Sequence, residues 1–383
     1  MSEAVIPAQS LCPLPLDVLP ANFQKHVDPK APMPLRMMGA KGLVPMSPKD
    51  MATALFMLTF DVDAGVREAA AKNAAGLPDR ILAVALRDET ADPRVLDYYV
   101  SALTNKPAYL EMLILNPSTP DEAVARVAAT PQDKLIEIIA QNQLRILRYD
   151  GIVRALVANP AARQSTLDNV TDFCVRSGLV LADVPAFQAA RKRVLGAAAD
   201  QTDAARGALE EAEAEEALER MGASDDPAEG GEAPPDDEEL DAEGKKKRLT
   251  LQQQIQKLSI AKKIEWANKK GNREVRTMLL RDPNKLVQLA VIQSPRITEG
   301  EIAKVAHSRT SPNEVLQHIY NNRLLVKNYS IKVNLVNNPK VPVAVAMRYL
   351  SLLRQSELKS VSKNRNISRA LQSQAQKLLD KKA

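Results

Sequence analysis

The side chains of this sequence that are best suited to chemistry are basic ones, which return once or twice in each helical segment of the C-terminal part. Guanidinium and ammonium groups bind carboxylates and phosphates through charge-assisted hydrogen bonds. Repeating helical units would align such groups in a stripe along one side. The candidate binding residues are Arg273, Arg276, Arg323, Lys327, Lys332, Arg348, Arg354, Lys363 and Arg365. Alternatively, each is a solvated residue whose aliphatic stem covers apolar neighbours.

The charge of the chain is divided sharply along its length. Residues 245–383 hold 29 Lys or Arg against 8 Asp or Glu, a net charge of +21. Residues 197–244 hold 2 against 18, a net charge of −16, and residues 1–196 hold 21 of each. A field as positive as that of the C-terminal part attracts a polyanion or an acidic protein.

Three anions compete for that basic surface. An acidic segment of a partner protein is the preferred one. Nucleic acid is the alternative, although the C-terminal part has few aromatic rings for stacking bases, so its binding would be sequence-non-specific and weakened by salt. The third anion is the chain's own acidic stretch, which could fold back and screen the basic surface.

The sequence shows no pattern typical of catalysis or of a metal site. His26, His307 and His318 are not spaced as ligands, and Cys12 and Cys174 form no C-x-x-C pair. Glycine-rich phosphate loops and nucleophile motifs do not occur. We therefore expect a non-catalytic protein without metal or cofactor. A repeat-built enzyme, of the kind that some DNA glycosylases represent, would need a deep pocket with a carboxylate near it.

The location of the protein follows from its cysteines and its apolar runs. Two isolated cysteines suit a reducing compartment. No apolar run approaches the roughly 20 residues that a helix needs to cross a bilayer. We expect a cytoplasmic protein that does not bind membranes.

The elements that position the basic side chains are short helices separated by recurring breakers. Residues 115–129, L-N-P-S-T-P-D-E-A-V-A-R-V-A-A, return at 292–306 as I-Q-S-P-R-I-T-E-G-E-I-A-K-V-A. In both copies a proline stops one helix, and a Thr followed three residues later by Glu predicts a capping box that starts the next. The predicted boxes pair Thr119 with Glu122, Thr250 with Gln253, Thr298 with Glu301 and Ser311 with Glu314. Such short helices must stack on their neighbours to be stable.

Two other features support the helical interpretation. Ser47 followed by Pro48 predicts a helix over about residues 48–60, and Asp63 is expected to cap the next one. When residues 114–177 are aligned with residues 292–356, their prolines, apolar residues and a tyrosine occur in the same order. Asn159-Pro160 then aligns with Asn338-Pro339. This order predicts a duplicated module.

Several phrases resemble known helical repeats. D-V-D-A-G-V-R-E-A-A-A-K at 61–72 resembles the second helix of a HEAT repeat, and N-P-S-T-P-D-E-A-V-A-R-V-A at 116–128 resembles the bacterial leucine-rich repeat variant. The best-known member of the latter family carries an iron–sulfur cluster, but the cysteines for it are absent here. Phrases such as L-L-R-D-P-N-K-L-V and N-N-P-K-V-P-V-A-V-A resemble a solenoid family of uncharacterised bacterial proteins, and no activity comes with that resemblance.

The predicted fold is all-α, with two α-solenoid modules joined by a disordered acidic linker. Residues 1–35 form a Pro-rich N-terminal arm or, alternatively, a cap that packs Leu14, Leu16, Val18 and Leu19 on the first helices. Residues 36–196 form the first module, 197–248 the acidic linker, in which 205–221 can be helical, and 249–383 the basic second module. The expected function is that of a scaffold or adaptor.

Overall fold

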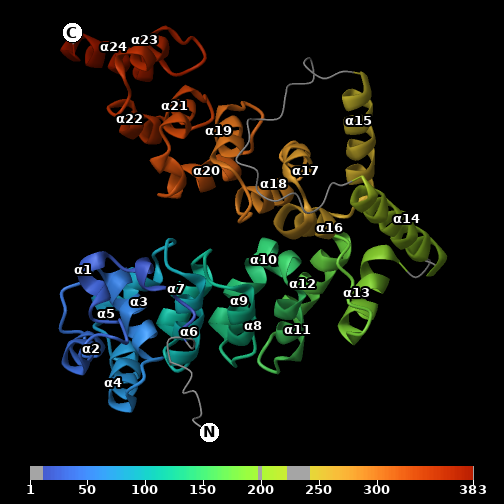
Figure 1. Cartoon of the computed structure of the whole chain (residues 1–383). Helices are drawn as coiled ribbons and strands as arrows, with labels where there is room; N and C mark the ends of the chain where they lie inside the picture. The colour runs from blue at the N-terminus through green and yellow to red at the C-terminus, as the bar shows by residue number, and fades with distance from the viewer. Residues whose placement is uncertain (1–11, 197–200, 222–241, 383) are drawn as a thin grey trace. The chain divides into compact units, whose positions relative to one another are not determined.

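The computed structural model describes residues 12–196, 201–221 and 242–382, and every regular element in these ranges is helical (Figure 1). The all-α prediction is confirmed. The chain divides into two compact units, Met1–Val170 and Thr171–Ala383, and the division falls inside helix α12 (Gln164–Arg176). No helix in the described ranges has both the length and the apolar character needed to span a bilayer.

The N-terminal unit consists of short helices that follow one another in chain order (Figure 1). Before α12 they are η2 (Leu16–Val18), α1 (Ala21–Gln24), α2 (Met33–Ala40), α3 (Pro48–Leu58), α4 (Ala64–Ala75), α5 (Asp79–Leu86), α6 (Pro93–Ala102), α7 (Pro107–Leu115), α8 (Asp121–Ala128), α9 (Asp133–Gln141), α10 (Gln143–Arg148) and α11 (Asp150–Ala158).

Local capping fixes the start of the helices α3 and α4. The Ser47 hydroxyl accepts the backbone N–H of Asp50 at 3.2 Å, and Pro48 occupies the first helical position. The Asp63 carboxylate accepts the N–H of Val66 at 3.0 Å. Both predictions are confirmed, because a side-chain acceptor at this position satisfies a backbone donor that has no partner within the helix. All residues of α3 from Met51 to Leu58 are buried, which makes α3 the centre of this unit's core.

The proline-rich stretch over residues 12–35 is packed rather than extended. Leu14, Leu19 and Val27 are buried, and two short helices, η2 and α1, form between the prolines. Of the four residues named for a cap, Leu14 and Leu19 are buried, Leu16 is partly exposed and Val18 is 40% exposed. Residues 1–11 lie outside the described ranges.

The C-terminal unit also consists of helices. After α12 they are α13 (Pro185–Leu195), α14 (Gln201–Arg220), α15 (Ala242–Lys257), α16 (Ile260–Glu265), the π-helical turn η3 (Trp266–Lys270), α17 (Arg273–Leu279), α18 (Lys285–Ile292), α19 (Glu299–His307), α20 (Asn313–Asn321), the 3₁₀ turn η4 (Leu325–Lys327), α21 (Tyr329–Asn337), α22 (Val343–Leu350), α23 (Gln355–Lys363) and α24 (Arg369–Lys382).

Part of the predicted acidic linker is folded. The helix expected within it is confirmed as α14, but α14 is not fully solvated, since Ala214 and Leu218 are buried. The Glu215 carboxylate accepts hydrogen bonds from Lys262 at 3.0 Å and Lys270 at 2.6 Å. Residues 222–241 of the predicted linker lie outside the described ranges.

Only one of the four predicted capping boxes forms. Thr298 accepts the N–H of Glu301 at 3.3 Å, and the Glu301 carboxylate accepts the N–H of Thr298 at 2.7 Å. The boxes at Thr119 and Ser311 are wrong. A proline follows each of them and becomes the N-cap, and their hydroxyls donate instead to the carbonyl oxygens of Leu113 and Val305, at 2.6 and 2.8 Å. A residue before proline is held extended, which favours this backward bond.

The fourth box, at Thr250, is also wrong. Helix α15 begins at Ala242 and runs through Thr250 to Lys257. The sequence between Gly244 and Lys257 contains no proline or glycine and is rich in Lys, Leu and Gln. These residues favour the helix, so nothing interrupts it before Thr250.

Three Asn-Pro pairs hold successive helical segments together in the same way, and we call Asn116, Asn159 and Asn338 the asparagine brackets. Each is buried, donates its side-chain N–H groups to two carbonyl oxygens about 30 residues earlier, and accepts the backbone N–H two residues later. Asn116 donates to the carbonyl oxygens of Leu86 (2.8 Å) and Asp88 (3.1 Å). Asn159 donates to those of Ala128 and Thr130 (both 2.8 Å), and Asn338 to those of Ala306 (2.8 Å) and Ser308 (3.0 Å).

Helix contacts follow the same spacing. In the N-terminal unit α8 packs against α6 and α11, and in the C-terminal unit α21 packs against α19 and α23. The brackets Asn159 and Asn338 follow α11 and α21 and bond to the ends of α8 and α19. The two landmarks that the sequence places opposite each other therefore make the same contacts in their own units.

Candidate functional site

An opening in the C-terminal unit lies among α17, α18, α19 and the loops that precede α18 and α20. It has a volume of about 630 Å³. Its wall is formed by Arg273, Thr277, Leu280, Arg281, Asp282, Pro283, Gln288, Glu301, Lys304, Val305, Ser308, Thr310, Ser311 and Pro312. We call this opening the basic cavity.

The two carboxylates of the basic cavity are engaged by the protein itself. Glu301 is 3% exposed, accepts two bonds within the capping box from Thr298, and pairs with Arg276 at 3.3 Å. Asp282 is 8% exposed, pairs with Lys263 at 2.9 Å, and accepts the N–H of Asn284 at 2.8 Å. Their negative charge is balanced by groups of the fold.

The cations of the basic cavity are Arg273, Arg281 and Lys304. Arg281 and Lys304 are exposed, whereas Arg273 is partly buried at the start of α17. The hydroxyl groups on the same wall are engaged within the protein. Thr277 and Ser311 donate to the carbonyl oxygens of Arg273 and Val305, both at 2.8 Å, and the hydroxyls of Ser308 and Thr310 bond to each other at 2.8 Å. Three cations therefore line a wall whose two carboxylates are paired with groups of the fold.

Arg276, one of the predicted binding residues, is buried and bonded to groups of the fold. It is 6% exposed, its Nε lies 3.3 Å from Glu301 Oε1, and its Nη1 donates to the carbonyl oxygen of Gly271 at 3.0 Å. A buried guanidinium that is already paired does not reach an external anion.

The other predicted residues do not line the basic cavity. Arg323, Lys327, Lys332, Arg348, Arg354, Lys363 and Arg365 lie on or between α20, α21, α22, α23 and α24. The guanidinium carbon of Arg354 lies 5.0 Å from the centroid of the Tyr329 ring, and that of Arg348 lies 6.0 Å from the centroid of the Tyr349 ring. Lys332 Nζ donates to the carbonyl oxygen of Lys327 at 3.4 Å. Their alignment into one stripe stays a prediction.

Sequence reasoning missed Arg281 and Lys304. The break at Asp282-Pro283 and the capping box at Thr298 and Glu301 were visible signals, but they were interpreted only as helix punctuation. Each missed cation lies close to one of these signals in the sequence, and residues from both places line the cavity.

Burial and hydrogen bonding shift the pKa values of two titratable groups in α20. Burial lowers the pKa of His318, so this residue is neutral near pH 7. The Glu314 carboxyl has a pKa below its usual range, because a backbone N–H and then Lys285, at 3.1 Å, stabilise its charged form. Among the described residues, no three His, Cys, Asp or Glu side chains gather in a group that could hold a metal ion.

Comparison of this chain with protein-family models, with curated proteins and with solved structures gives no match. The function must therefore be argued from the basic cavity itself.

Proposed function

We propose that this protein is a non-catalytic helical-repeat scaffold of the cytoplasm whose C-terminal unit binds an acidic segment of a partner protein in the basic cavity. The regular packing of helices and the asparagine brackets support an arrangement of stacked repeats. In such a scaffold the repeats present a surface, and affinity resides in a few sites along it.

The observation that carries the proposal is the division of charge within the basic cavity. Glu301 and Asp282 are held by Arg276 and Lys263, while Arg273, Arg281 and Lys304 line the same space. The cavity is lined by these three cations, and Asp or Glu side chains of a peptide match them. The net charge of +21 over residues 245–383 adds long-range attraction for an acidic segment.

The wall of the cavity favours a peptide over nucleic acid. Its fourteen lining residues include no aromatic ring that would stack on a base. The cations also surround a volume of about 630 Å³, which suits carboxylate side chains more than the regular phosphate rows of a duplex. Nucleic-acid binding is the competing outcome of the experiment below.

The experiment is a fluorescence-anisotropy titration of a labelled peptide rich in Glu and Asp with the full chain and a double variant, Arg281→Glu with Lys304→Glu. We expect the double variant to weaken binding by about tenfold or more, because two ion pairs are replaced by two repulsions. The matched control is Lys359→Glu with Lys377→Glu, which makes the same charge change at exposed residues of α23 and α24 outside the cavity.

Two results contradict the proposal. If the control variant loses as much affinity as the cavity variant, binding depends on net charge alone. If short duplex DNA binds more tightly than the peptide, with a steep dependence on salt, the basic surface recognises phosphates instead.

A further inference from the structure

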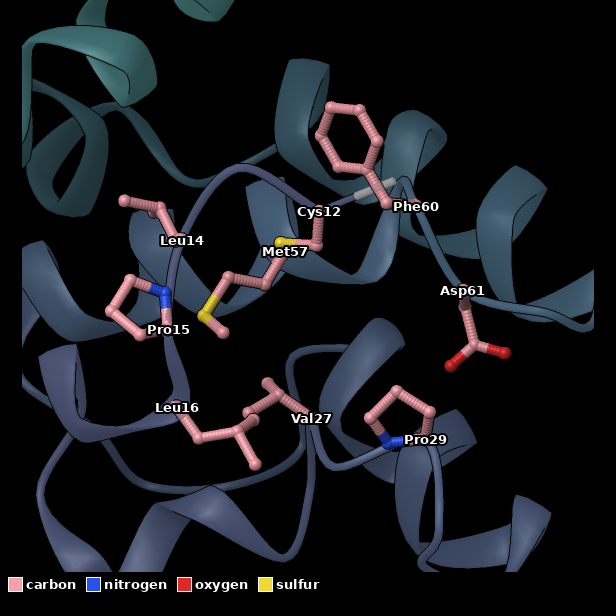
Figure 2. Close-up of a pocket in the computed structure, with 9 residues that line it drawn as sticks. All are labelled: Cys12, Leu14, Pro15, Leu16, Val27, Pro29, Met57, Phe60 and Asp61. Carbon is pink, nitrogen blue, oxygen red and sulfur yellow. The ribbon is translucent and has the colours of Figure 1, made fainter. Parts of the chain in front are cut away.

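A second cavity lies in the N-terminal unit, where the chain before α1, the turn after α1 and the end of α3 meet. It has a volume of about 220 Å³. Figure 2 shows the residues around it: Cys12, Leu14, Pro15, Leu16, Val27, Pro29, Met57, Phe60 and Asp61. Apolar cavities of about 150 Å³ accept benzene, so there is room here for a small organic molecule.

One charged side chain lies on this apolar wall. Asp61 is 4% exposed, and its Oδ1 accepts hydrogen bonds from Arg36 and from the backbone N–H of Asp63, the latter at 2.8 Å. Its other oxygen, Oδ2, is buried and has no hydrogen-bond partner in the described part of the chain. Figure 2 shows the carboxylate turned from the end of α3 toward Pro29. A buried acceptor without a donor is a costly arrangement that a ligand can relieve.

The charges around Asp61 already balance. Arg36 forms a buried ion pair with it, and Arg67 donates to its backbone carbonyl oxygen at 2.7 Å. Asp61 therefore already has its counter-ion. A charged ligand would place an unbalanced charge in apolar surroundings. An uncharged donor supplies the missing hydrogen bond to Oδ2 without that penalty.

We propose that this cavity binds a small, uncharged, mostly apolar molecule through one N–H or O–H group that donates to Asp61 Oδ2. The apolar walls from Leu14, Leu16, Val27 and Met57 enclose the body of the molecule, and the carboxylate selects for the donor. The proposal is independent of the basic cavity, because the two sites lie in different units.

The test compares two probes of the same outline. Indole carries one N–H donor, and benzofuran has an oxygen at the equivalent position. Calorimetric titration of the full chain is expected to give an affinity for indole at least about tenfold higher, the difference that a hydrogen bond to a carboxylate supports.

Cysteine labelling gives a second measurement on the unmodified protein. Cys12 is partly exposed on the wall of the cavity, and bound indole is expected to slow its reaction with a thiol reagent. Cys174 serves as the internal control, because it is fully buried and burial raises the pKa of its thiol to about 12. It is expected to stay unlabelled in the folded protein with or without indole.

Two variants sharpen the assignment. In Asp61→Asn, an amide that keeps its oxygen toward Arg36 and Asp63 turns its N–H₂ to the cavity, so the preference is expected to reverse in favour of benzofuran. In Leu16→Trp, a larger side chain from the half-buried rim fills the space and is expected to abolish binding of both probes. Circular dichroism checks the fold of each variant, and Leu16→Trp leaves the Arg36–Asp61 pair intact.

Several outcomes overturn the proposal. They are the absence of indole binding to the full chain, equal affinity for indole and benzofuran, and labelling of Cys12 that indole does not slow. Indole binding that survives Leu16→Trp would place the probe elsewhere. If Asp61→Asn does not fold, the affinities of the two probes and the labelling rate of Cys12 in the unmodified chain still test whether the cavity binds a donor ligand.

Discussion

Single residues set the contacts that the rest of the C-terminal unit requires, and Gly178 is the sharpest case. It adopts φ +83°, and a Cβ atom added there would lie 2.3 Å from the Cβ of Ser259. Ser259 is the N-cap of α16, and the neighbouring carbonyl oxygen of Ser177 accepts the N–H of Ala261 at 3.0 Å. The absence of a side chain at Gly178 lets the end of α12 approach the start of α16.

Gly178→Ala is therefore expected to destabilise the C-terminal unit by about 2–4 kcal/mol, from the left-handed backbone and from the displacement of Ser259. Trp266 is the sole tryptophan and is fully buried in this unit, so its fluorescence during urea unfolding reports the loss. Gly300→Ala in α19 is the matched control. Its Cβ meets nothing within 4 Å, and a gain of about 0.4–1 kcal/mol is expected there. Equal effects at the two positions would contradict this account.

At the scale of elements, the asparagine brackets join one helical segment to the next. Asn338 makes two donated bonds and one accepted bond while only 2% exposed. Asn322 also follows a helix, but its amide oxygen only accepts N–H groups of nearby residues, at 2.9 Å from Leu324 and 3.4 Å from Leu325. Both residues have an extended backbone, with φ −88° and −79°.

Asn338→Ala is expected to destabilise the C-terminal unit by about 2–4 kcal/mol, because two buried carbonyl groups at the end of α19 lose their donors. Asn322→Ala should cost about 0.5–1 kcal/mol, since it removes only local bonds. The midpoint of the Trp266 fluorescence transition in urea compares the two variants. An Asn338→Ala protein as stable as Asn322→Ala would show that the bracket is not what connects α19 to α21.

The same elements show what the sequence allows one to predict. The starts of α3 and α4 follow from Ser47, Pro48 and Asp63, because a cap side chain and the backbone N–H that it accepts lie within three residues. Thr119 and Ser311 failed as caps because their hydroxyls bond to the preceding helix, and that choice depends on the path of the chain before the proline.

The candidate site was harder to predict than the helices. The sequence identifies Arg273 and Arg276 equally, yet one lines the basic cavity and the other is buried against Glu301. Arg281 and Lys304 belong to the same wall because α17, α18 and α19 pack together there, which no local pattern reveals. The second cavity was not foreseen either, since Asp61 and Cys12 meet only through the folding of residues 12–35.

At the scale of the whole molecule, the formal net charge of +5 conceals three regions of very different charge. The acidic region divides into two parts with different roles. Helix α14 is structural, because Glu211 accepts the N–H and the hydroxyl of Ser259 at 3.0 and 2.6 Å and Leu218 is fully buried. The remaining carboxylates between α14 and α15 lie outside the described ranges and belong to no described contact.

These remaining carboxylates are expected to compete with an external acidic peptide for the basic cavity, since a tethered segment has a high effective concentration. The test replaces each Asp by Asn and each Glu by Gln at Asp225, Asp226, Glu229, Glu232, Asp236, Asp237, Glu238 and Glu239, and leaves α14 and α15 unchanged. Deleting residues 200–243 is a poorer test because it removes α14 and with it the contacts to Ser259.

We expect the neutralised protein to bind the labelled acidic peptide about tenfold more tightly at low salt, with the difference fading as salt screens the segment. A variant in which the order of residues 223–240 is shuffled at constant composition is the control, and it should bind like the unmodified protein, because screening depends on charge and not on sequence. An unchanged affinity after neutralisation means that the segment does not occupy the cavity. A tighter affinity in the shuffled control as well would indicate that a specific sequence, and not charge alone, is responsible.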